Sequence, residues 1–241
     1  MKTIVYIDGF NFYNGRLAKT NYKWLDLCKF GSHICQLLGS AYPVEPEPLI
    51  RYYTSAIKRH FSIAPETAPQ NQQTYLRALK HECGGNLRVY MGRFNHGKIF
   101  AYDASEDAPH VADQPEPKIR VWKLEEKRVD VALASDLIID AISGSAGAQI
   151  VVSNDEDLEP AILAVARQKP RIPIGIVSPS KKTQEGRLTR PPNNKLVAAT
   201  GRNDVLPYVN DSILDACMLP TPVRTPKNWT YCPIDWLPPA L

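Results

Sequence analysis

Two kinds of segment alternate along this chain of 241 residues, and the alternation limits what the chain can fold into. Short apolar runs rich in β-branched and aromatic residues predict buried strands at 3–7, 49–57, 87–92, 149–152 and 173–177. Apolar residues at helical spacing predict helices at 25–38, 70–82, 129–142, 158–167, 193–199 and 209–216. Strands that alternate with helices favour parallel pairing with right-handed crossovers. The sequence therefore predicts an α/β fold, with a mostly parallel sheet and helices on both faces in three α/β/α layers.

The chain shows no internal repeat and no clear linker, so we interpret residues 1–219 as a single domain. Segment 103–117 carries five acidic residues, three prolines and no Lys or Arg, which predicts a flexible surface insertion within this domain. Just before it, the turn signal Asn95-His-Gly97 predicts that 98–102 pairs back as a hairpin. The end of the chain, 220–241, is rich in Pro and Trp and is expected to pack on the domain as an extended tail.

Composition argues against membrane and secreted classes of protein. No stretch approaches the ~18 consecutive apolar residues that span a bilayer. Asp8 interrupts the apolar opening run, which is too short for a signal peptide. The five scattered cysteines contain no Cys-x-x-Cys pair, which argues against a zinc site or a disulfide framework. These features predict a protein of the reducing cytoplasm.

Four aspartates stand where predicted strands end and predicted helices begin. Asp8 ends the first strand, Asp130 opens a helix, and Asp155 and Asp157 follow another buried strand. In an open α/β sheet these positions converge on one crevice. Four carboxylates gathered there repel one another unless a divalent cation lies between them. Each aspartate alone also suits a helix cap or a turn, and only the set predicts a site.

The helix that Asp130 opens, 129–142, is apolar nearly all round, which predicts a buried helix. Asp136 lies about 120° around this helix from Asp130, because successive residues are separated by about 100°. We therefore separate it from the four aspartates and expect it to pair with Lys127 or Arg128, or to lie at the edge of the site.

Three acidic motifs resemble the NYN domain, a member of the PIN-like, Rossmannoid ribonucleases. They are Asp8-Gly-Phe-Asn11, Glu126-Lys-Arg-Val-Asp-Val131 and Val151-Val-Ser-Asn-Asp-Glu-Asp-Leu158. The resemblance covers nearly the whole chain, since four further stretches look like a bacterial subgroup of NYN proteins: 52–54, 73–79, 92–94 and 232–236. Two features depart from the family, namely Asn154, where many relatives have Gly, and the acidic insertion.

The resemblance implies a Rossmann-like, PIN-like fold and a metal-dependent ribonuclease, with endoribonuclease action expected. It implies a Mg²⁺ or Mn²⁺ site and hydrolysis of RNA phosphodiester bonds. Oxygen ligands suit Mg²⁺, and the bound metal would activate a water for attack on phosphorus. The implied catalytic and metal-binding residues are Asp8, Asp130, Asp155 and Asp157, with Asn11 and Ser153 in support.

The segment from Arg167 to Arg202 carries nine Lys and Arg against one acid, Glu185. A basic stretch beside an acidic pocket suits a polyanion such as RNA, although a plain solvated surface explains it equally well. The expected RNA-binding residues are Lys181, Lys182, Arg187, Arg190 and Arg16.

Other enzyme classes fit the sequence less well. A haloacid-dehalogenase-type phosphatase needs a second Asp at position 10, which is Phe. The glycine turn of a nicotinamide enzyme and the P-loop signature are both absent from the sequence. The alternative that stays open is a non-catalytic RNA-binding or regulatory module. A homodimer is compatible with such a fold, although no residue of the sequence predicts one.

Overall fold

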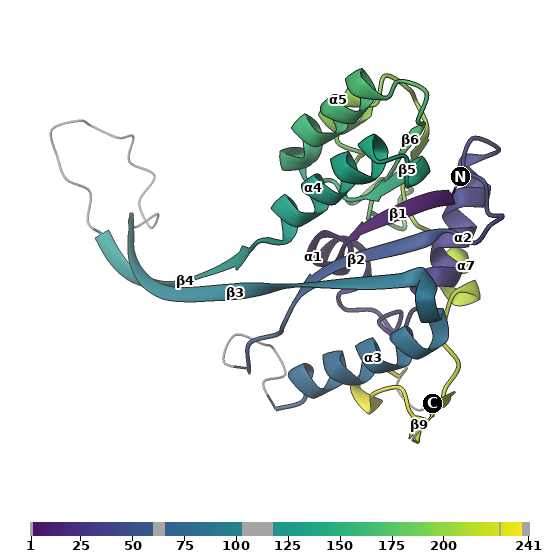
Figure 1. Cartoon of the computed structure of the whole chain (residues 1–241). Helices are drawn as coiled ribbons and strands as arrows, with labels where there is room; N and C mark the ends of the chain where they lie inside the picture. Colours follow the sequence, from purple (N-terminus) through teal and green to yellow (C-terminus); the bar gives the residue numbers. More distant parts are fainter. Residues whose placement is uncertain (1, 60–65, 103–117, 227, 238–241) are drawn as a thin grey trace, which may run out of the picture.

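A computed structural model describes residues 2–59, 66–102, 118–226 and 228–237 of the protein. The acidic segment 103–117, predicted as an insertion, lies outside the described residues. Seven strands form the main sheet in the order β4-β3-β2-β1-β5-β6-β7, and only the β3–β4 pair is antiparallel (Figure 1). The strands are β1 (Lys2–Asp8), β2 (Leu49–Ser55), β3 (Leu87–Tyr102), β4 (Lys118–Lys127), β5 (Ala146–Val152), β6 (Ile174–Val177) and β7 (Val205–Leu206).

Helices cover both faces of this sheet, so the predicted three-layer α/β/α fold is confirmed. One face carries α2 (Leu27–Leu38), α3 (Ala68–Cys83) and α7 (Asp211–Ala216), and the other carries α4 (Val129–Ile142), α5 (Glu159–Gln168) and α6 (Asn194–Ala199). Strand β1 shows why two layers of helices are needed. Its Val5 and Ile7 enter the first apolar cluster, whereas Ile4 and Tyr6 enter the second. Because successive side chains of a strand point to opposite faces, this strand, which is apolar from Ile4 to Ile7, must be covered on both sides.

The topology places a crevice at the carboxyl ends of β1 and β5. Strand β1 lies between β2 and β5, and the chain passes from β1 to α2 on one face of the sheet and from β5 to α5 on the other. In register, Ile7 lies opposite Val152, so that Asp8 and Ser153 meet one position further on. Ligands of open α/β sheets bind at such a switch point.

The segment after β1 is helical, with α1 (Gly9–Phe12) running into a π-helix, Tyr13–Leu17. One local prediction for the chain before β4 is wrong. The Asn95-His-Gly97 stretch is not a turn, because β3 runs through it to Tyr102. Gly97 lies opposite Lys123 within the antiparallel ladder that β3 forms with β4. The apolar and aromatic residues on both sides of the turn signal favour a continuous strand.

Helix α4 is buried on one side only, which corrects the prediction of a fully buried helix. Leu133 and Leu137 pack against the sheet at 1% and 0% exposure. On the opposite side, Val131 is 72% exposed and Ile139 is 59% exposed. An apolar side chain in a predicted helix does not reveal whether a layer of the same chain covers it.

The end of the chain contacts the layer that contains α3. The Trp236 ring lies 5.8 Å from the Tyr75 ring and 6.4 Å from the Trp24 ring, between centroids. Trp24 Nε1 also donates a hydrogen bond of 3.1 Å to the carbonyl oxygen of Pro220. Among the helices that the structure describes, none has the length and apolar character needed to cross a bilayer.

Candidate active site

Asp8 lies at the centre of the crevice, at the end of β1. Its side chain is almost fully buried, with the residue 3% exposed. The backbone N–H of Asn11 donates to Oδ1 at 2.9 Å, and Ser153 Oγ donates to Oδ2 at 2.8 Å. The first bond is also the cap of helix α1, which explains why the chain becomes helical directly after β1. Asn11 and Ser153 therefore both hold the Asp8 carboxyl in place.

Three of the four predicted carboxylates gather at this point. Asp8, Asp130 and Asp155 each offer an oxygen, and these oxygens lie within 4.8 Å of one another. Asp157 is exposed and lies outside this group, and its backbone N–H donates to Asp155 Oδ1 at 3.1 Å. We call Asp8, Asp130 and Asp155 the carboxylate triad. Such a triad can accept hydrogen bonds from a ligand or hold a cation.

The pKa of Asp8 is raised to about 6, first by burial and also by the nearby charges of Asp130 and Asp155, against the hydrogen bonds from Asn11 and Ser153. The pKa of Asp130 is also raised, first by burial and then by Asp155 and Asp157. Removal from water and like charges both disfavour the ionised carboxylate. Asp8 and Asp130 therefore take up protons at a higher pH than isolated aspartates do.

Two residues beside the triad were not predicted as site residues. Burial raises the pKa of Glu126, and the charge of Asp130 adds to the effect, while the nearby Ser55 hydroxyl opposes it. Burial also raises the pKa of Tyr52 to about 12, with smaller contributions from Asp8 and Glu126. Glu126 is the first residue of one of the three acidic motifs, whereas nothing in the sequence singles out a phenol in strand β2.

The turn after Asp8 needs glycine because other groups approach it closely. A Cβ added at Gly9 would lie 2.5 Å from the carbonyl oxygen of Tyr53 and 2.8 Å from Cε2 of the Tyr52 ring. Real Cβ atoms do not reach such distances, so a side chain here would displace the Tyr52 ring or the strand. Gly9 thus lets the ring lie against the Asp8 turn.

A cavity of about 410 Å³ opens beside the triad. Asn154 forms one wall, and its Nδ2 donates to Ser178 Oγ at 2.9 Å and to the carbonyl of Pro191 at 3.0 Å. Its backbone N–H donates to Asn11 Oδ1 at 3.2 Å, which connects the cavity to the residue whose own backbone N–H binds Asp8. The lining residues are Asn11, Asn154, Glu156, Arg190, Pro191, Pro192, Asn193, Asn194 and Lys195.

The cavity brings two cations close to the triad. Lys195 Nζ lies 3.3 Å from Glu156 Oε2, and both side chains are more than half exposed. The Arg190 side chain is exposed and has no partner among the residues that the structure describes. An unpaired guanidinium at the rim of a cavity is suited to a carboxylate or phosphate of a ligand.

The other cations predicted to bind RNA lie in different surroundings. Arg16 is 2% exposed, its Nε donates to the Val209 carbonyl at 2.6 Å, and its Nη2 pairs with Asp211. It therefore fixes the π-helix to the segment before α7 and is not available at the surface. Lys182 Nζ lies 4.6 Å from the centre of the Tyr208 ring, while Lys181 and Arg187 are exposed on the same loop.

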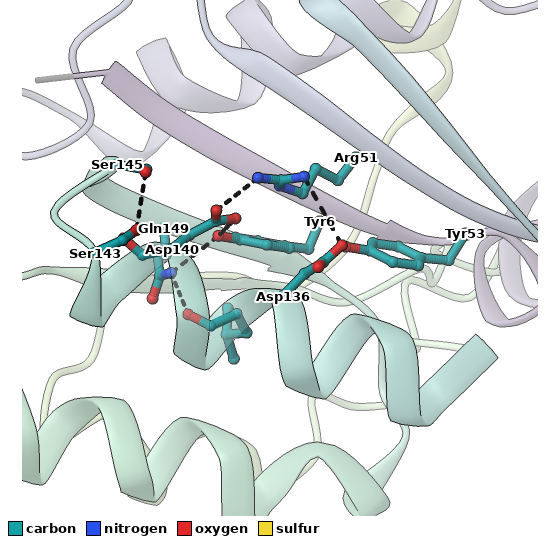
Figure 2. Close-up of polar contacts among 9 residues, drawn as sticks. Tyr6, Arg51, Tyr53, Asp136, Asp140, Ser143, Ser145 and Gln149 are labelled. Atoms are coloured by element: carbon teal, nitrogen blue, oxygen red, sulfur yellow. Dashed lines mark hydrogen bonds and ion pairs between the residues drawn. The ribbon is translucent and has the colours of Figure 1, made fainter. Parts of the chain in front are cut away.

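Asp136 belongs to a polar network between α4 and the sheet (Figure 2). It accepts a hydrogen bond of 2.8 Å from the Tyr53 hydroxyl and does not pair with Lys127 or Arg128, so that prediction is wrong. One turn later, Asp140 accepts from Tyr6 Oη at 2.8 Å and from Arg51 Nη2 at 2.6 Å. The helix phase that separated Asp136 from Asp130 turns it toward the tyrosines of the sheet. The network positions α4, and with it Asp130.

Comparison with known proteins gives one informative relative. No family model matches the chain, so the NYN resemblance stays a prediction. The chain is 31% identical over 245 residues to 6-hydroxy-3-succinoylpyridine 3-monooxygenase HspA of Pseudomonas putida, an alignment that covers 95% of this chain and 75% of that protein. A solved protein of unknown function from Vibrio parahaemolyticus is 15% identical, with 90% of this chain and 96% of that chain covered and a TM-score of 0.42, which is too low to support an argument.

The relative corrects the predicted chemistry. HspA is a monooxygenase, so the predicted Mg²⁺- or Mn²⁺-dependent ribonuclease is wrong in its reaction, its enzyme class and its cofactor. A metal ion was predicted because the carboxylates cluster at the switch point of the sheet. The same carboxylate oxygens can also accept hydrogen bonds from an organic ligand. RNA as a partner stays a prediction. With 31% identity along almost its full length, the chain belongs to the family of 6-hydroxy-3-succinoylpyridine 3-monooxygenase HspA.

Proposed function

We propose that the protein is a monooxygenase that acts on a small hydroxylated aromatic N-heterocycle with an acidic side chain. The observation that carries this proposal is the 31% identity to HspA over 95% of the chain. The name of that relative describes a hydroxypyridine that bears a succinoyl group, which ends in a carboxylate. The crevice and its cavity offer groups complementary to both ends of such a molecule.

Acceptors and cations are separated in this site. The carboxylate triad provides hydrogen-bond acceptors that suit the ring O–H or N–H of a hydroxypyridine. Arg190 and Lys195, on the cavity side, suit the acidic tail. Asn11 connects the two ends, because its backbone binds Asp8 and its side chain binds the backbone of Asn154. A substrate with a donor at one end and a carboxylate at the other is therefore bound in one orientation.

In this proposal Asp8 accepts the proton of the ring hydroxyl. Its pKa of about 6 leaves it mostly ionised at neutral pH, yet basic enough to take up a proton during the reaction. Deprotonation raises the electron density of the ring, which favours attack on an activated oxygen. Ser153 and the Asn11 backbone hold the carboxyl in a fixed orientation while the proton moves.

The balance of the reaction requires a partner for oxygen. One atom of O₂ enters the substrate and the other leaves as water, which consumes two electrons and two protons. The electrons come from a reductant such as NADH or NADPH, and flavins are among the cofactors that supply oxygen chemistry when bound. A flavin phosphate does not fit the turn after β1, because the carboxylate triad occupies the place where dinucleotide folds present backbone N–H groups.

The test is oxygen consumption by the purified protein with NADH or NADPH, with and without added FAD or FMN. Hydroxypyridines with and without a carboxylate-bearing tail serve as substrates, and ¹⁸O₂ labelling shows whether one oxygen atom enters the product. We expect turnover of the acidic hydroxypyridine, with loss of at least 100-fold in Asp8→Asn. Absence of substrate-dependent oxygen uptake under every combination would refute the proposal.

We also place the protein in the cytoplasm. All five cysteines are free, and four of them are buried. Free thiols are typical of reducing compartments, where nicotinamide reductants are also present. Fractionation of the producing cells tests this placement.

A further inference from the structure

Strands β3 and β4 extend beyond the body of the sheet as a two-stranded arm (Figure 1). Their ladder runs from Arg93 opposite Lys127 to the pair of Tyr102 and Lys118. Most side chains of β4 are exposed, and no helix covers them in the part of the chain that the structure describes. A ribbon of two strands is marginally stable by itself in water, so a further contact along this arm would stabilise it.

One face of the arm is aromatic and basic. Cross-strand partners share a face, which places Phe100 beside Arg120 and Lys98 beside Trp122. Phe100 is 69% exposed and Trp122 is 57% exposed. Lys98 Nζ lies 5.0 Å from the centre of the Trp122 ring. We call this the aromatic face of the arm.

Helix α4 presents a second exposed apolar surface. Val131, Ile139 and Ile142 are 72%, 59% and 57% exposed. Their spacing of eight and three residues places them along one side of the helix, opposite the side that packs on the sheet. Large apolar side chains aligned in this way mark an interaction surface more often than isolated exposed ones do.

We propose that a second copy of this chain covers both surfaces, so that the aromatic face of each arm lies along the exposed side of α4 in the other copy. The lengths are similar. Val131 to Ile142 spans ~17 Å of helix at 1.5 Å per residue. Phe94 to Phe100 of β3, which both lie on the aromatic face, spans ~20 Å at about 3.3 Å per residue. Each copy carries both surfaces, as a two-fold, isologous dimer requires.

Charge favours this pairing over other contacts between copies. The arm presents Lys98 and Arg120 on its aromatic face, whereas Asp130, Asp155 and Asp157 surround the N-terminal end of α4. Opposite charges therefore meet when the arm of one copy lies on α4 of the other. Two aromatic faces packed on each other would bring like charges together, which costs energy.

The dimer would also complete the crevice. The aromatic face starts at Phe94, which lies opposite Glu126 and contacts the Phe10 ring at 6.4 Å between centroids. Both residues lie beside the carboxylate triad, and Asp130 of the triad directly precedes Val131 of the exposed side. An arm that reaches the Val131 end of α4 in the other copy would lie next to Asp130 of that copy and limit the access of water to its crevice. The dimer stands independently of the reaction proposed above.

The first test is the mass of the purified chain by sedimentation velocity at 5 to 100 µM. We expect a dimer for the wild type and monomers for Phe100→Asp and for Ile139→Asp. Ile119→Asp is the matched control, because Ile119 is 44% exposed on the other face of the same arm. It should remain a dimer. Circular dichroism checks that every variant is folded. A wild type that is monomeric at 100 µM, or equal effects of all three variants, would overturn the proposal.

A cross-linking experiment distinguishes the arrangement from other dimers. Phe100→Cys chains are mixed with Ile139→Cys chains and treated with a short bismaleimide. Arm-to-helix contact predicts that the mixed pair cross-links at least five times faster than either variant alone. Faster linkage of Phe100→Cys chains with one another would indicate arm-to-arm contact and refute the inference. The wild-type chain measures the background of cross-linking through Cys28, its own partly exposed thiol.

Discussion

Ser153 Oγ donates a hydrogen bond of 2.8 Å to Asp8 Oδ2, across the junction between β5 and β1. Ser153 is fully buried, and its hydroxyl also accepts the backbone N–H of Asp155 at 3.1 Å. One serine thus connects two members of the carboxylate triad. The bond stabilises the ionised form of Asp8 and opposes the effect of burial on its pKa.

Replacement of this serine should shift the pH dependence of the enzyme. In Ser153→Ala the ionised Asp8 loses a hydrogen bond, so the pKa of Asp8 should rise above its value of about 6. The acidic limb of the kcat/KM profile should move to higher pH by about half a unit to one unit. Ser178→Ala is the control, because Ser178 is a buried serine at the end of β6 that does not bond to Asp8. Identical acidic limbs in wild type and Ser153→Ala would exclude Asp8 as the group that titrates.

The raised pKa of Asp8 also predicts a loss of stability with rising pH. The ordinary value is 3.8, and the folded value is about 6, so between these values the folded state binds more protons than the unfolded chain. The free energy of unfolding must therefore fall as pH rises through this window. Each pKa unit corresponds to about 1.4 kcal/mol, which gives roughly 3 kcal/mol for Asp8 as an upper estimate.

Urea unfolding at pH 4, 5, 6 and 7 measures this effect. Asp8→Asn keeps the size of the side chain and removes the charge, so its stability should decline less between pH 4 and 7 and should exceed that of the wild type at pH 7. Glu156→Gln is the control, since Glu156 is exposed and lies outside the triad. A parallel decline in wild type and Asp8→Asn would contradict the assignment.

Variants of Arg190 and Arg187 distinguish substrate binding at the cavity from a general effect of positive charge. Both are exposed on the same loop, but only Arg190 lines the cavity beside Asn154. Arg190→Ala should raise KM for a substrate with a carboxylate tail about 10- to 100-fold, as expected for a lost charged hydrogen bond of 1.5–3 kcal/mol. It should leave KM for a substrate without the tail nearly unchanged. Arg187→Ala should change neither, and equal effects of both variants would argue for non-specific attraction.

The sequence predicted the framework of the site better than its chemistry. Asp8 and Asp155 follow buried strands, and parallel strands place such residues at one edge, where the structure brings them together with Asp130. The sequence could not predict that Arg190 lies at the cavity, because this depends on how the long loop after β6 folds back onto Asn154. The burial of Arg16 depends on Val209 and Asp211, which are far away in the chain.

The local sequence pattern around the aspartates could not predict the reaction. Carboxylates near one another repel, and either a metal ion, a shared proton or a ligand with hydrogen-bond donors relieves the repulsion. Nothing in the spacing of Asp8, Asp130 and Asp155 distinguishes these cases. The turn signal at Asn95 failed for a related reason, since the ladder with β4 depends on residues that follow much later in the chain.

The ion pair between Arg51 and Asp140 should be the strongest polar contribution to the position of α4 (Figure 2). The two side chains are 15% and 6% exposed and 2.6 Å apart, whereas the Arg59–Glu66 pair is more than half exposed on both sides. Asp140→Leu leaves the guanidinium without its nearest carboxylate and should lower the free energy of unfolding by about 3–5 kcal/mol. Arg51→Met combined with Asp140→Leu should lower it by less than Asp140→Leu alone, because no unpaired charge then stays buried. Urea unfolding of the two single variants and the double variant measures this coupling.

Glu66→Gln is the control and should cost less than about 1 kcal/mol. Additive effects of the two replacements would show that Arg51 finds enough solvent or help from Asp136, 3.8 Å away, to need no partner in Asp140.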